Sequence, residues 1–236
     1  IYKQSSTMKL TAQDIFNKLI AYKGQTGAIF FELGGLQVNI ESRDSVGNLL
    51  QEWIRKWFQS EGIDFVIPDN TQDFPDFYLD GDNLKTGLLE VKSFNYNQSP
   101  TFDVAAFQAY ARSLLSHPYR LDSDYLIIGY SMNGSIIEIK DIWLKKVWEI
   151  TGTSAKWPLN VQAKQGNIFN VRPVKWYLRT ARDTGAKFPR FSSALQFVEA
   201  FDATLRQWTV TSQQAQTSTW LRLIKRGYKA ETGKDL

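Results

Sequence analysis

Two short apolar segments, residues 74–79 and 87–94, constrain the fold of this chain most, because each carries charges inside an otherwise apolar run. Turn residues at 81–83 separate them, so we expect two β-strands joined by a turn. An isolated pair of strands is only marginally stable, and its apolar face must be covered by other elements. The rest of the chain must therefore supply a larger sheet and the helices that cover it.

The charges within these two segments fall on one side. Side chains alternate between the two faces of a strand, which places Glu90 and Lys92 on one face and Leu89 and Val91 on the other. If the two strands pair, Asp76 of the first segment joins Glu90 and Lys92 at one place.

Two carboxylates and an ammonium at one place form a candidate site for phosphodiester hydrolysis. Asp76 and Glu90 repel each other unless a cation joins them, and Mg²⁺ prefers oxygen ligands while keeping positions open for water and phosphate. The metal lowers the pKa of a bound water, and Lys92 can orient or deprotonate that nucleophile and neutralise charge. The alternative interpretation is an ordinary hairpin whose charges are solvated.

The composition excludes several other kinds of active site. The chain has 236 residues and no cysteine, so disulfides, thiolate zinc sites and cysteine nucleophiles are excluded. The one histidine, His117, precedes Pro118 and is expected in a turn that ends a helix, which argues against a histidine-dependent nuclease site or a Ser-His-Asp triad. Catalysis must rest on carboxylates, Lys, Arg, Ser, Thr or Tyr.

The hydrophobic pattern along the chain predicts an α/β fold. Thr11 is the expected N-cap of the first helix. Helices are expected at residues 11–22, 44–58, 102–116, 141–150, 192–208 and 217–228. Further strands are expected at residues 29–33, 36–40, 63–67, 124–130 and 135–139, with Gly34-Gly35 and Asn133-Gly134 as hairpin turns. The second helix carries an apolar face that we expect to be core: Leu49, Leu50, Trp53, Ile54, Trp57 and Phe58.

A family resemblance rests on the charged strands. Pro75-Asp76, thirteen intervening residues and Glu90-Val91-Lys92 resemble the PD-(D/E)xK motif of the restriction-endonuclease-like nucleases. Three longer runs are similar to type II restriction enzymes of the NgoBV kind: residues 47–53, 89–94 and 120–126. The resemblance spans about residues 10–190 and implies a restriction-endonuclease-like core, with a mixed central β-sheet flanked by helices. It also implies Mg²⁺ as cofactor and cleavage of duplex DNA at a short palindrome, with GGNNCC as a candidate.

The resemblance assigns roles to individual residues. It implies that Asp76, Glu90 and Lys92 are catalytic, and that Asp76, Glu90 and Val91 bind the metal. Related nucleases often draw another acid from the helix before the hairpin, which makes Glu52 a further catalytic candidate.

Each remaining acid near the motif has a structural alternative. Glu52 is also spaced for an i,i+4 ion pair with Lys56 on the surface of its helix. Pro68-Asp69 is a second Pro-Asp pair, but the polar run after it indicates a turn. Asp73 lies one step out of phase with Asp76 and is expected at the strand entrance.

Positive charge is concentrated in residues 151–191, which carry eight basic residues and one acidic residue and have a net charge of +7, against −3 for the rest of the chain. Basic residues interleaved with aromatic ones suit phosphate clamping and base readout in a DNA groove. The alternative is a charged surface over a sheet edge, with the aromatic residues in the core. The candidate DNA contacts are Lys164, Arg172, Lys175, Arg179, Arg182, Lys187 and Arg190.

We expect a single nuclease domain over residues 1–236, with a catalytic core at about 44–150, the basic segment at about 151–191 and C-terminal helices at about 192–230. A two-fold DNA site is matched by a homodimer on double-stranded DNA. No stretch approaches the roughly 18 apolar residues of a membrane span, and residues 1–7 lack the apolar core of a secretory signal, so we expect a cytoplasmic protein. Two other functions stay open: a repair, recombination or transposition nuclease, and a non-catalytic DNA-binding domain.

Overall fold

The computed structural model describes residues 8–70, 73–208 and 214–236. The chain forms two compact units, one of Ile1–Ser99 with Asp124–Lys145 and one of Pro100–Ser123 with Lys146–Leu236. Residues 100–123 thus group with the C-terminal helices. The single nuclease domain and its segment boundaries stay predictions.

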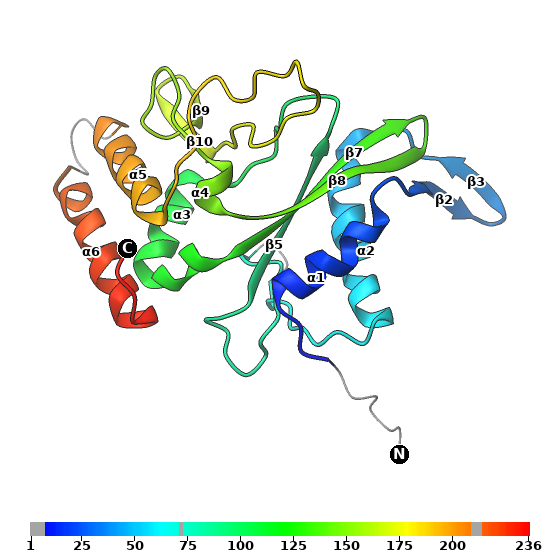
Figure 1. The fold of residues 1–236 in the computed structure, drawn as a ribbon, viewed down its shortest axis with the longest axis horizontal. Helices are drawn as coiled ribbons and strands as arrows, with labels where there is room; N and C mark the ends of the chain where they lie inside the picture. The colour runs from blue at the N-terminus through cyan, green and yellow to red at the C-terminus, as the bar shows by residue number, and fades with distance from the viewer. Residues whose placement is uncertain (1–7, 71–72, 209–213) are drawn as a thin grey trace. The chain divides into compact units, whose positions relative to one another are not determined.

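The first unit is built on a five-stranded sheet with the strand order β1-β8-β7-β5-β4. Its three long strands, β8, β7 and β5, are labelled in Figure 1. The strands are β1 (Thr26–Ala28), β4 (Phe77–Tyr78), β5 (Leu88–Asn95), β7 (Asp124–Asn133) and β8 (Ile136–Lys146). β5 runs parallel to β7, whereas β4 is antiparallel to β5 and β1 is antiparallel to β8. The sheet is therefore mixed, as expected.

Two helices of the first unit cover this sheet. α1 (Ala12–Leu19) continues into η1 (Ile20–Tyr22), and α2 (Val46–Ser60) follows η2 (Arg43–Ser45). The predicted N-cap of α1 is confirmed, since Thr11 and Asp14 form a capping box. Both helices bury apolar residues against the strands in one cluster, which includes Ile15, Ile54, Leu89 and Leu126. Burial of this apolar surface is what holds the helices on the sheet.

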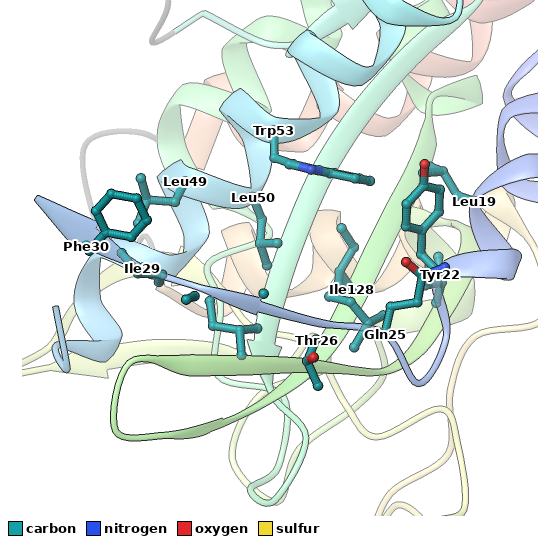
Figure 2. Close-up of a pocket in the computed structure, with 15 residues that line it drawn as sticks. Leu19, Tyr22, Gln25, Thr26, Ile29, Phe30, Leu49, Leu50, Trp53 and Ile128 are labelled. Carbon is teal, nitrogen blue, oxygen red and sulfur yellow. The ribbon is translucent and has the colours of Figure 1, made fainter. Parts of the chain in front are cut away.

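The apolar face of α2 is wider than the part of it that is buried. Leu50, Ile54, Trp57 and Phe58 belong to the core, as expected. Leu49 and Trp53 are 42% and 40% exposed, so the prediction that the whole face is core was wrong for these two residues. They line a hollow of about 400 Å³ (Figure 2).

A separate hairpin, β2 (Phe30–Leu33) and β3 (Leu36–Asn39), forms a two-stranded sheet of its own, here called the β2–β3 arm (Figure 1). Gly34 and Gly35 form its turn with φ of 60° and 78°, the left-handed conformation that a two-residue hairpin turn requires. The predicted hairpin is confirmed.

Among the described residues, the second unit contains a three-stranded sheet in the order β6-β10-β9, four α-helices and one 3-10 helix. The strands are β6 (Ala105–Ala106), β9 (Val161–Lys164) and β10 (Asn167–Val171). The helices are α3 (Phe107–Ser116), η3 (Pro118–Asp122), α4 (Val147–Ile150), α5 (Ala194–Trp208) and α6 (Gln214–Thr232). His117 ends α3 as its C-cap, in agreement with the turn expected there.

Several element predictions were wrong. The helix expected at 141–150 is limited to α4, because residues 141–146 continue β8, where Ile142 is buried in the sheet core. The strand expected at 63–67 is reduced to isolated bridges, from Ile63 to Met8 and from Val66 to Tyr78. Strands β1, β6, β9 and β10 were not expected, and all are five residues or shorter. Such short strands depend on long-range partners that local periodicity does not reveal.

Candidate active site

The pairing of β4 with β5 brings the two charged segments together. Phe77 pairs with Leu89 and Tyr78 with Leu88 in antiparallel register. Continued by one residue, this register sets Asp76 opposite Glu90. The predicted pairing of the two strands is confirmed.

Hydrogen bonds then join the predicted residues into one cluster. The main-chain N–H of Val91 donates to Asp76 Oδ2 at 2.7 Å, and the main-chain N–H of Asp76 donates to Glu90 Oε2 at 3.2 Å. Lys92 Nζ lies 2.8 Å from Glu90 Oε1, so the ammonium and the carboxylate form an ion pair on the same face of β5. Each of the two carboxylates therefore contacts the segment that carries the other.

The cluster is shielded from solvent. Glu90 is only 7% exposed, and Asp76 and Lys92 are half-buried. Burial raises the pKa of Asp76 to about 7, and the neighbouring charge of Glu90 acts in the same direction. The N–H of Val91 and the charge of Lys92 oppose this effect. An ordinary hairpin with solvated charges would show neither the burial nor the raised pKa, so that interpretation does not describe this site.

A glutamine of α2 completes the surroundings of Asp76. Gln51 Nε2 donates a hydrogen bond of 2.5 Å to Asp76 Oδ1, the oxygen that Val91 leaves free. Sequence reasoning missed Gln51 because it looked for a further acid on this helix. The available signal was its position next to Glu52, one residue after the buried Leu50.

The donor atoms of the cluster fit a hard divalent cation. Asp76 and Glu90 provide carboxylate oxygens, and the peptide group of Val91 is held against Asp76 by its own hydrogen bond. Within the described ranges no group of three or more Asp, Glu, His or Cys side chains could hold a metal ion. Two carboxylates and a main-chain carbonyl are nonetheless enough for Mg²⁺, which usually keeps several waters.

The comparisons with known proteins identify the family of this chain. The family model for the NgoBV restriction endonuclease matches residues 9–236. The chain belongs to the NgoBV restriction endonuclease family. It is 40% identical over 234 residues to the type II restriction enzyme NlaIV of Neisseria lactamica, covering 97% of this chain and 93% of that protein. It is 38% identical over 183 residues to the type II restriction enzyme NgoBV of Neisseria gonorrhoeae, covering 75% of this chain and 98% of that protein.

The fold agrees with this membership. The solved structure of the NlaIV restriction endonuclease matches with a TM-score of 0.90 and 38% identity, covering 98% of this chain and 94% of that one. The resemblance to type II restriction enzymes of the NgoBV kind is therefore confirmed, as is the mixed sheet flanked by helices. In the described parts of this NgoBV-family chain, no helix is long and apolar enough to cross a membrane.

Glu52, the further acid expected from α2, lies at the edge of the site. Its side chain is 65% exposed and pairs with Arg55 at 3.6 Å, where the sequence had suggested Lys56. Glu52 and Asp76 both line a small hollow of about 40 Å³. The hydrogen bond to Asp76 Oδ1 comes from the neighbouring Gln51.

The other two acids that the sequence placed near Asp76 lie on the surface. Asp69 is exposed. Asp73 is exposed too; its N–H donates to Asn70 O at 2.9 Å and its carboxylate accepts from Asn70 Nδ2 at 3.1 Å. The turn expected after Asp69 includes residues 71 and 72, which lie outside the described residues.

The candidate DNA contacts in the basic segment are of two kinds. Some form ion pairs with acidic side chains, and the others are exposed. Lys175 forms an ion pair with Asp183 in which the two side chains are only 10% and 12% exposed, and Arg172 pairs with Asp103. Arg179 Nε lies 3.8 Å from Asp183 Oδ2, but the residue remains exposed. The other candidates are also exposed: Lys164, Arg182, Lys187 and Arg190. The aromatic residues divide as well, since Trp176 and Tyr177 are buried and Phe169 is 51% exposed.

Proposed function

We propose that this chain is a Mg²⁺-dependent type II restriction endonuclease that hydrolyses phosphodiester bonds of duplex DNA at a short palindromic site. The observation that carries the proposal is the buried cluster of Asp76, Glu90 and Lys92, joined by hydrogen bonds across β4 and β5. The membership in the NgoBV restriction endonuclease family supports the same reaction.

Three residues would hold the metal. Asp76 and Glu90 offer carboxylate oxygens, and Val91 offers its main-chain carbonyl, the only oxygen that a valine has. When bound, Mg²⁺ supplies Lewis acidity to the phosphate and lowers the pKa of a water ligand. The raised pKa of Asp76 fits this role, because a cation stabilises the charged carboxylate that burial disfavours.

Lys92 would act on the nucleophile and on the phosphate. Its ammonium is held 2.8 Å from Glu90 Oε1, so it sits beside a metal-binding carboxylate with its position restrained. From there it can orient a water by hydrogen bonding and neutralise the charge that grows on the phosphoryl oxygens. A group held in place before the reaction begins costs little reorganisation in the transition state.

Gln51 would position Asp76. Its amide occupies Oδ1 while the Val91 N–H occupies Oδ2, which fixes the plane of the carboxylate. Outer partners of this kind commonly orient metal ligands. We propose this role for Gln51 in preference to Glu52, whose side chain is largely in solvent.

DNA contact is proposed for the basic segment, with phosphate contacts from its exposed cations: Lys164, Arg179, Arg182, Lys187 and Arg190. Arg172 and Lys175 stay in the proposed set with a lower expectation, because acidic partners already occupy them. We also propose a homodimer in the cytoplasm, since a palindromic site has the two-fold symmetry of two identical protomers.

Digestion of phage DNA by the purified chain, followed by sequencing of the ends, tests the function. Discrete fragments with uniform ends, formed in Mg²⁺ and not in EDTA, are expected, and each end should carry the same short palindrome. Glu90→Ala should produce no fragments yet still bind DNA in Ca²⁺. Nicking that depends on DNA structure, or degradation from the ends, would favour a repair, recombination or transposition nuclease. Binding without any cleavage would favour a non-catalytic DNA-binding domain.

A further inference from the structure

Asp183 is the one acidic residue of the basic segment, residues 151–191. It lies in the connection from β10 to α5, residues 172–193, which contains no helix or strand (Figure 1). Connections longer than roughly 12–15 residues without secondary structure are uncommon, and those that are ordered usually have a function. An acid in a segment proposed to bind DNA also repels phosphates unless its charge is engaged elsewhere.

The Asp183 carboxylate ties the two ends of a loop together. The main-chain N–H of Arg179 donates to Asp183 Oδ2 at 3.0 Å, and the main-chain N–H of Gly185 donates to Oδ1 at 3.0 Å. Lys175 Nζ donates to Oδ2 and forms an ion pair with it. The N–H of Asp183 itself donates to Thr180 O at 3.0 Å. One side chain thus closes residues 175–185, here called the Asp183 loop, into a compact loop of the kind that is often functional.

The Asp183 loop has a buried base and an exposed tip. Trp176 and Tyr177 are each 8% exposed, and their rings make an edge contact with centroids 5.4 Å apart. Residues 178–182, the tip, are all exposed. The tip carries two guanidinium groups three residues apart, those of Arg179 and Arg182. The loop therefore presents two cations to solvent on a base that is packed into its unit.

The charge of Asp183 is directed into the loop and away from solvent. Its side chain is only 12% exposed. The ammonium of Lys175 and the N–H groups of Arg179 and Gly185 hold the pKa of Asp183 well below its usual range, so the carboxylate is ionised at neutral pH. Lys175 offsets its negative charge, which leaves little repulsion toward a phosphate at the tip.

A closed loop lowers the cost of binding DNA. A flexible loop loses conformational entropy when its cations settle on phosphates, and this loss subtracts from the affinity. The hydrogen bonds to Asp183 fix the main chain on both sides of the tip before DNA arrives. The two arginines of the tip can then contact the backbone together without that loss.

We propose that Asp183 is a positioning residue for DNA binding, which holds the Asp183 loop closed so that Arg179 and Arg182 meet the DNA backbone together. The inference rests on the proposed contact between the basic segment and DNA, and it deepens that proposal by naming the residue that shapes the contact. Lys175 contributes less to the closure, because both main-chain hydrogen bonds to Asp183 remain without it.

Two variants that change the charge equally test the role of Asp183. Asp183→Ala and Asp183→Asn both remove one negative charge, but only asparagine keeps an oxygen that accepts a main-chain hydrogen bond. Charge alone predicts that both variants bind DNA more tightly. The positioning role predicts that Asp183→Ala weakens binding at least about tenfold at roughly 0.1 M salt and lowers the log–log salt slope by about two, since both arginine contacts are lost. Asp183→Asn should bind at least about threefold more tightly than Asp183→Ala, the scale of one retained hydrogen bond.

Asp103→Ala is the charge-matched control. Asp103 pairs with Arg172 of the same basic segment, and its side chain is 50% exposed. Its removal makes the same change in net charge without touching the Asp183 loop, so binding should be no weaker than for the wild type. Titration of the full chain with a fluorescent duplex of random sequence in Ca²⁺, at several salt concentrations, gives affinity and slope. Circular dichroism checks folding, and Asp183→Asn against Asp103→Ala decides the question if Asp183→Ala does not fold, with the asparagine variant expected to bind more weakly.

A double-mutant cycle separates positioning from a general loss of structure. Arg182→Ala should weaken the wild type but have little further effect in the Asp183→Ala background, because the contact is already lost there. Additive effects, or an Asp183→Ala variant that folds and binds as tightly as Asp103→Ala, would overturn the inference. If the wild type still cuts phage DNA at one defined sequence, such a result leaves the proposed nuclease standing. A wild type that binds no duplex DNA would instead remove the proposed DNA contact and the role of Asp183 with it.

Discussion

Gln51 Nε2 donates a hydrogen bond of 2.5 Å to Asp76 Oδ1, which ties helix α2 to the carboxylate that lies opposite Glu90. The contact joins residues 25 positions apart in the sequence. The two neighbouring residues of α2 therefore differ in their surroundings. Gln51 contacts Asp76, whereas the Glu52 side chain is 65% exposed. This arrangement gives the first prediction.

Gln51→Ala should lower the cleavage rate about 10- to 100-fold and raise the Mg²⁺ concentration needed for half-maximal activity, because outer partners of metal ligands have effects of this size. Initial rates on a plasmid substrate across a Mg²⁺ titration measure both quantities. Glu52→Ala serves as the comparison and should have the smaller effect. If Glu52→Ala were the more damaging change, the acid expected from the sequence would be the functional residue of this helix.

Asp76→Asn should stabilise the metal-free protein at pH 8. Burial raises the pKa of Asp76 to about 7, so between about pH 4 and 7 the folded state holds a proton that the unfolded chain has released. The unfolding free energy of the wild type therefore falls as pH rises through this window, by at most about 4 kcal/mol for this one group. The asparagine variant lacks that fall.

Urea unfolding in EDTA at pH 4.5 and pH 8 measures the effect of Asp76→Asn. Asp69→Asn, which changes an exposed carboxylate of the same region, is the control and should follow the wild type. Added Mg²⁺ should stabilise the wild type and not Asp76→Asn, because binding to the folded state alone raises stability. If the unfolding free energies of all three proteins depended equally on pH, the pKa of Asp76 would not be raised in the folded state.

Lys92→Ala should reduce the cleavage rate at least about a hundredfold, the scale of one positioned acid, base or charge-stabilising group. The fold should persist, since the Lys92 side chain reaches Glu90 at the half-buried site and is not part of the apolar core. Single-turnover cleavage reports the rate, circular dichroism the fold, and binding in Ca²⁺ the affinity for DNA. Turnover near that of the wild type would reduce Lys92 to a structural partner of Glu90.

Lys187→Ala and Arg182→Ala should each lower the log–log dependence of DNA affinity on salt by about one, because each exposed cation that contacts a phosphate releases counterions. Lys175→Ala should behave differently, since its ammonium is held by Asp183 within the segment. We expect it to lower the melting temperature and leave the salt slope unchanged. Fluorescence titrations with specific and random duplexes in Ca²⁺ at several salt concentrations give the slopes. A loss of slope for Lys175→Ala alone would reverse these assignments.

Strand periodicity by itself determined which charged side chains of β5 share one face. A strand repeats every two residues wherever it lies, so Glu90 and Lys92 had to share one face and Leu89 had to point to the other. Local chemistry likewise determined the Thr11 cap and the Gly34-Gly35 turn, because both depend on neighbours within four residues. These features were predicted correctly since no distant partner is involved.

The tertiary structure alone decided which partners these local elements meet. Gln51 faces Asp76 because of how α2 lies on the sheet, and helical phase cannot tell it from Glu52 without that packing. Residues 141–146 became strand because they continue β8, the sheet neighbour of β7, beyond the end of its pairing with β1, and sheet pairing outweighed a local pattern that suggested a helix. The ion pair of Lys175 with Asp183 neutralises one cation of a segment that composition had marked as strongly basic, and the sequence alone did not show which cation the one acidic residue would meet. In each case, contacts between residues far apart in the sequence decided the structure, and the local sequence pattern does not contain this information.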